Sequence, residues 1–188
     1  TIGKNPAVLI FTQDAFWNNE NKNENHGIAY FDGNMFEPYM ERENTNFENA
    51  TGLPIDNHYT SAYDICLIAR ELINKYGDLI LPITSRYDDY VREGTEKQFW
   101  LVNTNKLVKY IEGVDGLKTG WTNTAGYNIV TTKEDNGMRL ISVVMGCTTS
   151  QNRTKDTVAL LNYGFSNYEI IKLFSKGDII KTIKKIKI

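Results

Sequence analysis

The sequence predicts an α+β domain in which helices flank an antiparallel sheet. Two β-rich runs, residues 127–132 and 139–145, are separated by a segment that ends in Asn136-Gly137, a dipeptide typical of tight hairpins. Apolar residues recur at helical spacing before and after this hairpin. The run 139–145 does not alternate strictly between apolar and polar residues, which favours a sheet covered on both faces.

The first predicted helix follows a turn at Thr51-Gly52-Leu53-Pro54. Thr60 or Ser61 can cap its amino end, and Asp64 in its first turn suits the helix dipole. Gly77 is the predicted residue after its carboxyl end. The predicted buried stripe consists of Ile65, Ile68, Leu72 and Tyr76.

The pattern then predicts a second, shorter helix, a strand and a closing helix. Residues 78–92 are expected to hold this second helix or a helical turn, and residues 99–102 a strand or extended segment that leads into Asn103-Thr104-Asn105. The buried anchors of the second helix are Tyr87, Tyr90 and Val91, and the stripe of the closing helix is Thr154, Val158, Leu161 and Phe165.

Pattern alone assigns no firm fold to residues 1–45. Residues 6–11 are an apolar run that fits a strand or a helix edge, residues 18–25 are polar, and Asp32-Gly33-Asn34 indicates a turn. At the other end, the isoleucines and lysines of residues 175–188 fit a basic membrane-surface segment or an edge strand protected by lysines. We favour the edge strand.

Composition excludes several classes of protein. A net charge of −2 argues against a nucleic-acid-binding protein, and no apolar run approaches the roughly 18 residues that span a bilayer. No signal peptide is visible. Cys66 and Cys147 fall in apolar patterns and should be small buried hydrophobes, and two histidines without a Cys cluster argue against a metal site.

The chemistry of the chain centres on Lys118-Thr119-Gly120. On an exposed strand, Lys118 and Gly120 point to one face and Thr119 to the other. Glycine leaves room for another chain to pair with the strand, and a lysine with nearby hydroxyls can hold a carboxylate. The alternative is a short strand with a solvated lysine.

The run from Asn46 to Phe165 resembles the serine-type D-alanyl-D-alanine carboxypeptidases, the low-molecular-mass penicillin-binding proteins of peptidase family S11. The resemblance lies in a series of pieces in matching order. They are residues 46–54, residues 58–64, Asn103-Thr104-Asn105 with Leu107, residues 113–122, residues 136–141, Arg153, and Tyr163-Gly164-Phe165.

This resemblance implies part of the penicillin-binding protein/β-lactamase-like transpeptidase fold. It implies removal of the terminal D-Ala of peptidoglycan stem peptides through an acyl-enzyme, in the cell envelope and without a cofactor or metal. β-Lactams would bind if a nucleophile is present, and the membrane would be reached only through a C-terminal anchor that this chain lacks. The implied division is an unassigned segment 1–45, a carboxypeptidase-like domain 46–168, and a linker or truncated β domain 169–188.

The resemblance also implies roles for individual residues. Lys118, Thr119 and Gly120 would bind the substrate carboxylate, Thr122 would also bind substrate, and the backbone N–H of Trp121 would belong to the oxyanion hole. Arg153 would help to fix the carboxylate, or it is a surface arginine in the first turn of a helix. Thr104 would border the site, or it belongs to a turn capped by two asparagines.

The nucleophile of this family is not found in the sequence. It would be the serine of a Ser-x-x-Lys motif, but no serine is followed three residues later by lysine. Thr1-Ile2-Gly3-Lys4 and residues 182–185 match only with threonine, and the sole Ser-x-Asn is Ser150-Gln151-Asn152, after the Lys118 strand. The chain is therefore either a fragment or an inactive homologue that binds peptidoglycan peptides or a partner.

Overall fold

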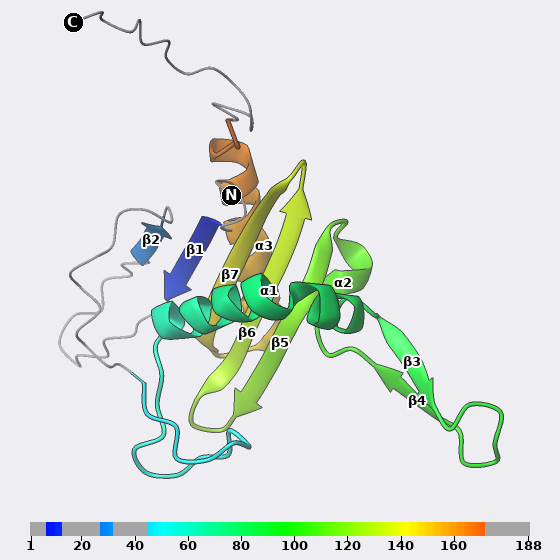
Figure 1. Ribbon diagram of the computed structural model, residues 1–188. Helices are drawn as coiled ribbons and strands as arrows, with labels where there is room; N and C mark the ends of the chain where they lie inside the picture. The colour runs from blue at the N-terminus through cyan, green and yellow to red at the C-terminus, as the bar shows by residue number, and fades with distance from the viewer. Residues whose placement is uncertain (1–6, 13–26, 32–44, 172–188) are drawn as a thin grey trace, which may run out of the picture.

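The computed structural model describes residues 7–12, 27–31 and 45–171, and its centre is a five-stranded sheet of order β2-β1-β7-β6-β5 (Figure 1). Strands β5 (Val114–Thr122), β6 (Gly126–Asp135) and β7 (Met138–Cys147) are consecutive and antiparallel. Strand β1 (Ala7–Thr12) pairs parallel with β7 and antiparallel with β2 (Gly27–Phe31). The predicted antiparallel sheet is confirmed, with one parallel pairing added.

Helices cover both faces of this sheet, as predicted. Helix α1 (Ala62–Thr84) crosses one face, and α3 (Ser150–Asn167) lies on the other (Figure 1). The short helix α2 (Leu107–Tyr110) belongs to the α3 side, because its Leu107 shares a core with Leu160 and Leu161 of α3. Alternate residues of β7 therefore enter two cores, which explains its continuous apolar sequence.

The predicted hairpin between β6 and β7 is confirmed. Its turn residues Asn136 and Gly137 have φ angles of 50° and 78°, the left-handed pair that a two-residue hairpin turn requires. The closing helix is confirmed too. It is capped by Thr149, whose side chain accepts from the N–H of Asn152, and Leu161 of its predicted stripe is buried.

Helix α1 begins as predicted, with the Ser61 hydroxyl accepting from the N–H of Asp64. Its buried face was predicted only in part: Ile65 is partly buried against the core, but two other residues of the predicted stripe are exposed. Ile68 is 47% exposed and Tyr76 is 55% exposed. The buried residues are Ala62, Cys66, Ala69 and Ile73. Three of these four side chains are small, so the helix lies close against Ile141 and Val143 of β7.

The predicted break beside Gly77 is confirmed as a kink at Tyr76, with φ −132° and ψ 16°, which divides α1 into two helical segments. The second segment ends at Thr84, so the predicted extension of the second helix to residue 92 is wrong. The chain then forms β3 (Asp88–Val91), which pairs with β4 (Phe99–Val102), the strand predicted at 99–102. Tyr90 and Val91 are exposed rather than buried, and the hairpin projects from the body (Figure 1).

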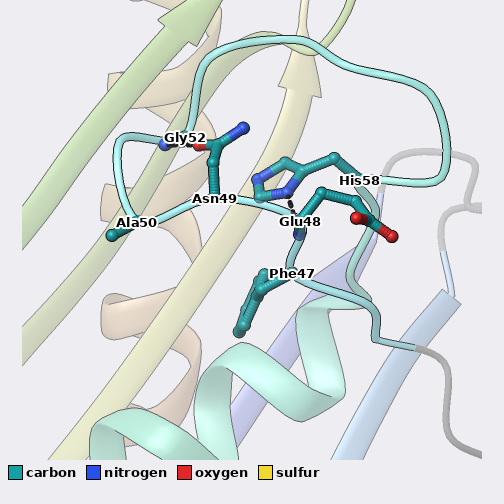
Figure 2. A pocket seen from close by; sticks show the side chains of 6 residues that line it. All are labelled: Phe47, Glu48, Asn49, Ala50, Gly52 and His58. Atoms are coloured by element: carbon teal, nitrogen blue, oxygen red, sulfur yellow. Dashed lines mark hydrogen bonds between the residues drawn. The ribbon is translucent and has the colours of Figure 1, made fainter.

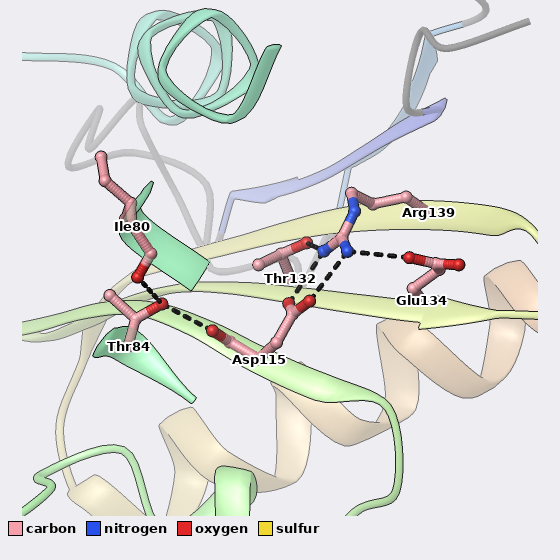
Figure 3. Close-up of polar contacts among 6 residues, drawn as sticks. All are labelled: Ile80, Thr84, Asp115, Thr132, Glu134 and Arg139. Carbon is pink, nitrogen blue, oxygen red and sulfur yellow. Dashed lines mark hydrogen bonds and ion pairs between the residues drawn. The ribbon is translucent and has the colours of Figure 1, made fainter. Parts of the chain in front are cut away.

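A cluster of polar side chains joins β5, β6 and β7 (Figure 3). Arg139 of β7 forms a bidentate ion pair with Asp115 of β5, with N···O distances of 2.8 Å, and donates to Thr132 and Glu134 of β6. Burial alone lowers the pKa of Arg139, but the hydrogen bonds and charges of Asp115 and Glu134 outweigh it and raise that pKa above its usual value. This cluster fixes β5 at the edge of the sheet.

Both cysteines are buried, as predicted. The run predicted at residues 6–11 coincides with β1. The features expected at residues 18–25, 32–34 and 175–188 lie outside the described residues, and the division of the chain into domains stays a prediction.

Candidate active site

The Lys118 strand is β5, and its outer edge is open. Among the described residues β5 pairs only with β6, at the end of the sheet. Lys118 and Gly120 are exposed, whereas Thr119 is 8% exposed. The predicted exposed strand with alternating faces is therefore confirmed, and its unpaired backbone groups are available to a further chain.

This edge borders a cleft of about 1340 Å³. The cleft lies between β5, the amino end of α1 and the loop of residues 46–59, and its floor includes Val130, Val143 and Met145. All the side chains predicted to bind substrate line it, as does Trp121. They are Lys118, Thr119, Gly120, Thr122, Thr104 and Arg153. The fold thus gathers residues from three separate segments around one space.

Gly120 keeps the cleft open beside the strand. A Cβ atom built at this position meets no atom within 4 Å, and the backbone does not have the positive φ that demands glycine. Neither packing nor backbone conformation within the described residues therefore requires glycine here. Glycine at this position leaves open space at the edge of the strand, beside the cleft.

Asn103 and Asn105 hold the segment that carries Thr104. The Asn103 side chain donates to the carbonyls of Thr84 and Arg86, at 3.0 and 2.9 Å, and accepts from the N–H of Asn105. The buried Asn105 side chain donates to the Gly116 carbonyl at 3.1 Å and accepts from the N–H of Leu107. Both asparagines thus tie the segment to α1 and β5.

Thr104 and Thr119 meet through their hydroxyls, whose oxygens lie 2.6 Å apart. Thr104 is exposed and Thr119 is buried, so this contact joins the cleft surface to the inner side of β5. On the same strand, the Lys118 ammonium donates to the carbonyl of Thr119. Within the described residues no carboxylate lies within 4 Å of this ammonium, so its charge is open to an anion.

Arg153 supplies a second cation to the cleft from the first turn of α3. Its Nε is buried and has no hydrogen-bond partner among the described residues. Burial lowers the pKa of Arg153, and the nearby Cys147 and Tyr127 partly offset this effect. A half-buried guanidinium with an unused donor favours binding of an anion such as a carboxylate.

The far end of β5 carries an exposed aromatic residue. Trp121 is 55% exposed, and its ring lies 5.8 Å from that of Tyr127 on β6. The Thr122 hydroxyl accepts from the N–H of Ala125 at 2.9 Å and so shapes the turn into β6. Gly126 in that turn has φ 66°, and a Cβ there would lie 2.7 Å from the carbonyl of Cys147.

Comparison with known proteins shows to which family the chain belongs. The model of the D-alanyl-D-alanine carboxypeptidase family matches residues 39–149, which is more than half of the chain. This chain belongs to the D-alanyl-D-alanine carboxypeptidase family. It is 43% identical over 142 residues to D-alanyl-D-alanine carboxypeptidase DacF of Bacillus subtilis, covering 76% of this chain and 36% of that protein.

A second relative of this family gives a similar picture. D-alanyl-D-alanine carboxypeptidase DacA of Escherichia coli K12 is 36% identical over 137 residues, covering 72% of this chain and 32% of the relative. The chain thus spans about a third of the length of these two relatives.

Solved structures of penicillin-binding proteins share the fold. Penicillin-binding protein D2 from Listeria monocytogenes, in a cefotaxime-bound form, matches with a TM-score of 0.57 and 37% identity, over 64% of this chain and 48% of that chain. Penicillin binding protein 5 from Haemophilus influenzae matches with a TM-score of 0.61 and 37% identity, over 68% of this chain and 36% of that chain. The predicted part of the penicillin-binding protein fold is confirmed.

The loop of residues 46–59 lines the cleft together with β5 and also borders a smaller, open pocket of about 550 Å³ (Figure 2). The Asn49 side-chain oxygen accepts from the N–H groups of Thr51 and Gly52 and from the Thr51 hydroxyl. The Nδ1 atom of His58 accepts from the N–H of Glu48 at 3.0 Å. Local hydrogen bonds therefore hold this loop in the absence of a helix or strand.

In the described part of the chain, no serine or threonine is followed three residues later by lysine, the spacing that the nucleophile of this family requires. Ser61 lines the cleft, a position that sequence reasoning missed because it treated Ser61 only as a helix cap; Asp64, not lysine, follows three residues later. Ser150 opens α3 and does not line the cleft. Thr1 and Thr182 lie outside the described residues.

Neither a metal cluster nor a membrane helix is found in the described ranges. These residues contain no group of three or more His, Cys, Asp and Glu side chains placed to hold a metal ion. None of their helices has the length and apolar character needed to cross a membrane.

Proposed function

We propose that this chain forms the carboxylate-binding side of a D-alanyl-D-alanine carboxypeptidase site, and that its ligand is a peptidoglycan stem peptide ending in D-Ala-D-Ala. The observation that carries the proposal is the open edge of β5, where the exposed Lys118 and the unobstructed Gly120 face a large cleft. An extended peptide can pair with this edge while its terminal carboxylate meets the Lys118 ammonium.

The proposed roles of the other residues follow from their positions. Thr104 and Thr119 offer hydroxyls, Thr122 shapes the far end of the strand, and Arg153 adds a second cation. The backbone N–H of Trp121 would stabilise the negative charge that develops on the carbonyl under attack. Peptidoglycan lies outside the cytoplasm, so we place the protein in the bacterial cell envelope.

Two functions remain for the chain itself. A carboxypeptidase would transfer the acyl group to a hydroxyl, release D-Ala and hydrolyse the ester with water. A binding protein would hold the same peptide without cleaving it. The lack of Ser-x-x-Lys throughout the 188 residues favours binding without turnover for this sequence. In both cases β5 recognises the peptide terminus.

Labelling with a fluorescent penicillin, followed by intact-mass measurement of the denatured protein, distinguishes the two functions. A β-lactam opens on an active hydroxyl and leaves a stable ester, so turnover chemistry would give one covalent adduct. We expect no adduct from folded protein. A single adduct, located by peptide mapping to one hydroxyl, would show that a nucleophile is present and that the binding-only function is wrong.

A further inference from the structure

We infer that His58 is a positioning residue for peptide binding: its neutral imidazole holds the loop of residues 46–59 in shape, and protonation of the ring loosens that loop. This inference rests on the proposed function of the cleft, because residues from both ends of the loop, Phe47 and Tyr59 among them, line that cleft. His58 lines it as well, and its ring also borders the smaller pocket (Figure 2).

The backbone contact of His58 fixes the protonation state of its ring. The N–H of Glu48 donates to Nδ1 of His58 at 3.0 Å (Figure 2). A backbone N–H can only donate a hydrogen bond, so Nδ1 must offer a lone pair. The folded loop therefore holds a neutral imidazole whose single proton is on Nε2. A second proton would turn Nδ1 into a donor that faces another donor, and the bond would be lost.

The loop depends on polar contacts for its shape. None of residues 46–59 is buried, so the loop gains little from either hydrophobic core. Asn46 and Tyr59 join its two ends through paired backbone hydrogen bonds of 2.9 and 3.0 Å. The bond from Glu48 to His58 is the next link between these ends. Loss of this link should lower the fraction of molecules in which the loop is ordered, and affinity falls with that fraction.

No acidic partner stabilises a protonated His58 ring. Among the described residues, no carboxylate oxygen lies within 4 Å of either ring nitrogen. Glu48 is the only other charged residue that borders the smaller pocket, and its carboxylate accepts from the Asn46 side chain at 2.6 Å. The aromatic neighbour of the ring is the uncharged Phe47, with centroids 5.7 Å apart. The charged residues that line the cleft are cations, which disfavour a further positive charge. They are Lys106, Lys118 and Arg153.

This arrangement gives peptide binding a pH dependence of defined sign. Imidazole is the side chain that ordinarily changes its charge between pH 8 and pH 5, whereas a peptide carboxylate, a lysine and an arginine ordinarily keep theirs. The loop requires the neutral ring. Affinity for the peptide should therefore be highest at the upper end of this range and should decrease as the pH falls.

The test measures the affinity for acetyl-Lys-D-Ala-D-Ala by calorimetry at pH 7.5 and at pH 5.5. His58→Asn keeps an acceptor close to the position of Nδ1 but takes up no proton, and His58→Leu removes the acceptor. His26→Asn is the matched control, because the chain contains only two histidines and His26 lies outside the described residues. Thermal unfolding at both pH values confirms that each variant is folded.

We expect the parent and His26→Asn to bind about fivefold more weakly at pH 5.5 than at pH 7.5, the size of one ordinary hydrogen bond. His58→Asn should bind within about twofold of the parent at pH 7.5 and should keep that affinity at pH 5.5. His58→Leu should bind about fivefold more weakly than the parent at pH 7.5, with no further loss at pH 5.5. A merely structural role of the side chain would lower the affinity of the variants without removing the pH dependence.

Two binding results would overturn this inference alone. One is an equal affinity of the parent at both pH values, and the other is the same pH dependence in His58→Asn as in the parent. A ¹H–¹⁵N correlation spectrum of the imidazole rings tests the inference without a ligand. It should show the His58 proton on Nε2 at pH 7.5, and a proton on Nδ1 would also overturn the inference. Failure of the parent to bind the peptide at either pH, with that tautomer present, would instead remove the proposed function, and the role of His58 in binding with it.

Discussion

Two glycines of the Lys118 region have different physical purposes. Gly113 has φ 80°, and a Cβ there would lie 2.2 Å from the carbonyl oxygen of Glu134, so the fold itself requires glycine. Gly120 meets neither condition. We propose that glycine at position 113 is needed for the stability of the fold, and that glycine at position 120 keeps the edge of β5 accessible to a ligand.

This assignment predicts opposite outcomes for the two positions. Gly120→Val should leave the free energy of unfolding within about 0.5 kcal/mol of the parent but weaken binding of acetyl-Lys-D-Ala-D-Ala at least about tenfold, because the side chain fills the peptide's path. Gly113→Ala should lose about 1–3 kcal/mol of stability. Urea unfolding measures the stability of each variant, and calorimetry measures its affinity for the peptide. Gly120→Val that binds normally would contradict ligand access as the reason for Gly120.

The buried thiols define a second property at this scale. Burial raises the pKa of Cys66 to about 12 and that of Cys147 to about 11, from an ordinary value of 9.0. Both residues are fully buried and hence inaccessible to reagents. In folded protein at pH 8, we expect a disulfide reagent to react slowly with both thiols, and in urea to react fast with both. Fast reaction of the folded protein would show that these sites open.

The same shifts predict a loss of stability at high pH. The folded chain keeps the two thiol protons to a higher pH than the unfolded chain does, so their contribution is complete below about pH 9. It declines as the pH rises from 9 toward 11 and 12. The urea concentration at the unfolding midpoint should therefore decrease as the pH is raised from 8 to 10. The decrease should be smaller in a variant with both cysteines replaced by alanine.

At the scale of elements, helix α1 shows where sequence reasoning goes wrong. Two stripes with the same helical spacing, one of large residues from Ile65 and one of small residues from Ala62, lie next to each other on the helix. Periodicity alone cannot tell which of the two stripes is buried, and the larger apolar side chains favour the stripe that is mostly exposed. The small stripe is buried because the helix approaches the sheet closely, a fact that depends on β7 rather than on the helix sequence.

The corrected face is testable with two adjacent residues. Ala69 is 4% exposed against Ile141 and Val143, so Ala69→Leu should overpack this core and cost about 1–3 kcal/mol of unfolding free energy. Its neighbour Ile68 faces solvent, so Ile68→Gln should change stability by less than about 0.5 kcal/mol. If urea unfolding showed Ile68→Gln to be more destabilising than Ala69→Leu, the face that the sequence predicted would be supported instead.

The Arg139 cluster joins three strands and should account for the rigidity of β5. Arg139→Lys keeps the charge but loses the bidentate contact, and should cost about 1–2 kcal/mol. Arg139→Met leaves the largely buried Asp115 without its partner and should cost about 3 kcal/mol. Lys75→Ala, which removes the exposed pair with Glu71, is the matched control and should stay within about 0.5 kcal/mol. Equal stabilities for all three variants would exclude a structural role for the cluster.

At the scale of the whole molecule, the sequence predicted what local chemistry determines. The β6–β7 hairpin follows from Asn136-Gly137, the closing helix from its stripe, and the exposed strand from Lys118 and Gly120. Contacts between distant segments were not predictable. The Thr104–Thr119 contact, the Arg139 cluster and the cleft lining formed by residues 46–59 depend on how strands and loops meet in space.

The central claim is that the open edge of β5 binds the terminus of a D-Ala-D-Ala peptide. Titration of ¹⁵N-labelled protein with acetyl-Lys-D-Ala-D-Ala, followed by two-dimensional NMR, tests it most directly. We predict that the chemical-shift changes are concentrated at residues 117–122, Thr104 and Arg153, and that they are lost in Lys118→Ala. Shifts located elsewhere, or equal affinities for the parent and Lys118→Ala, would contradict the claim.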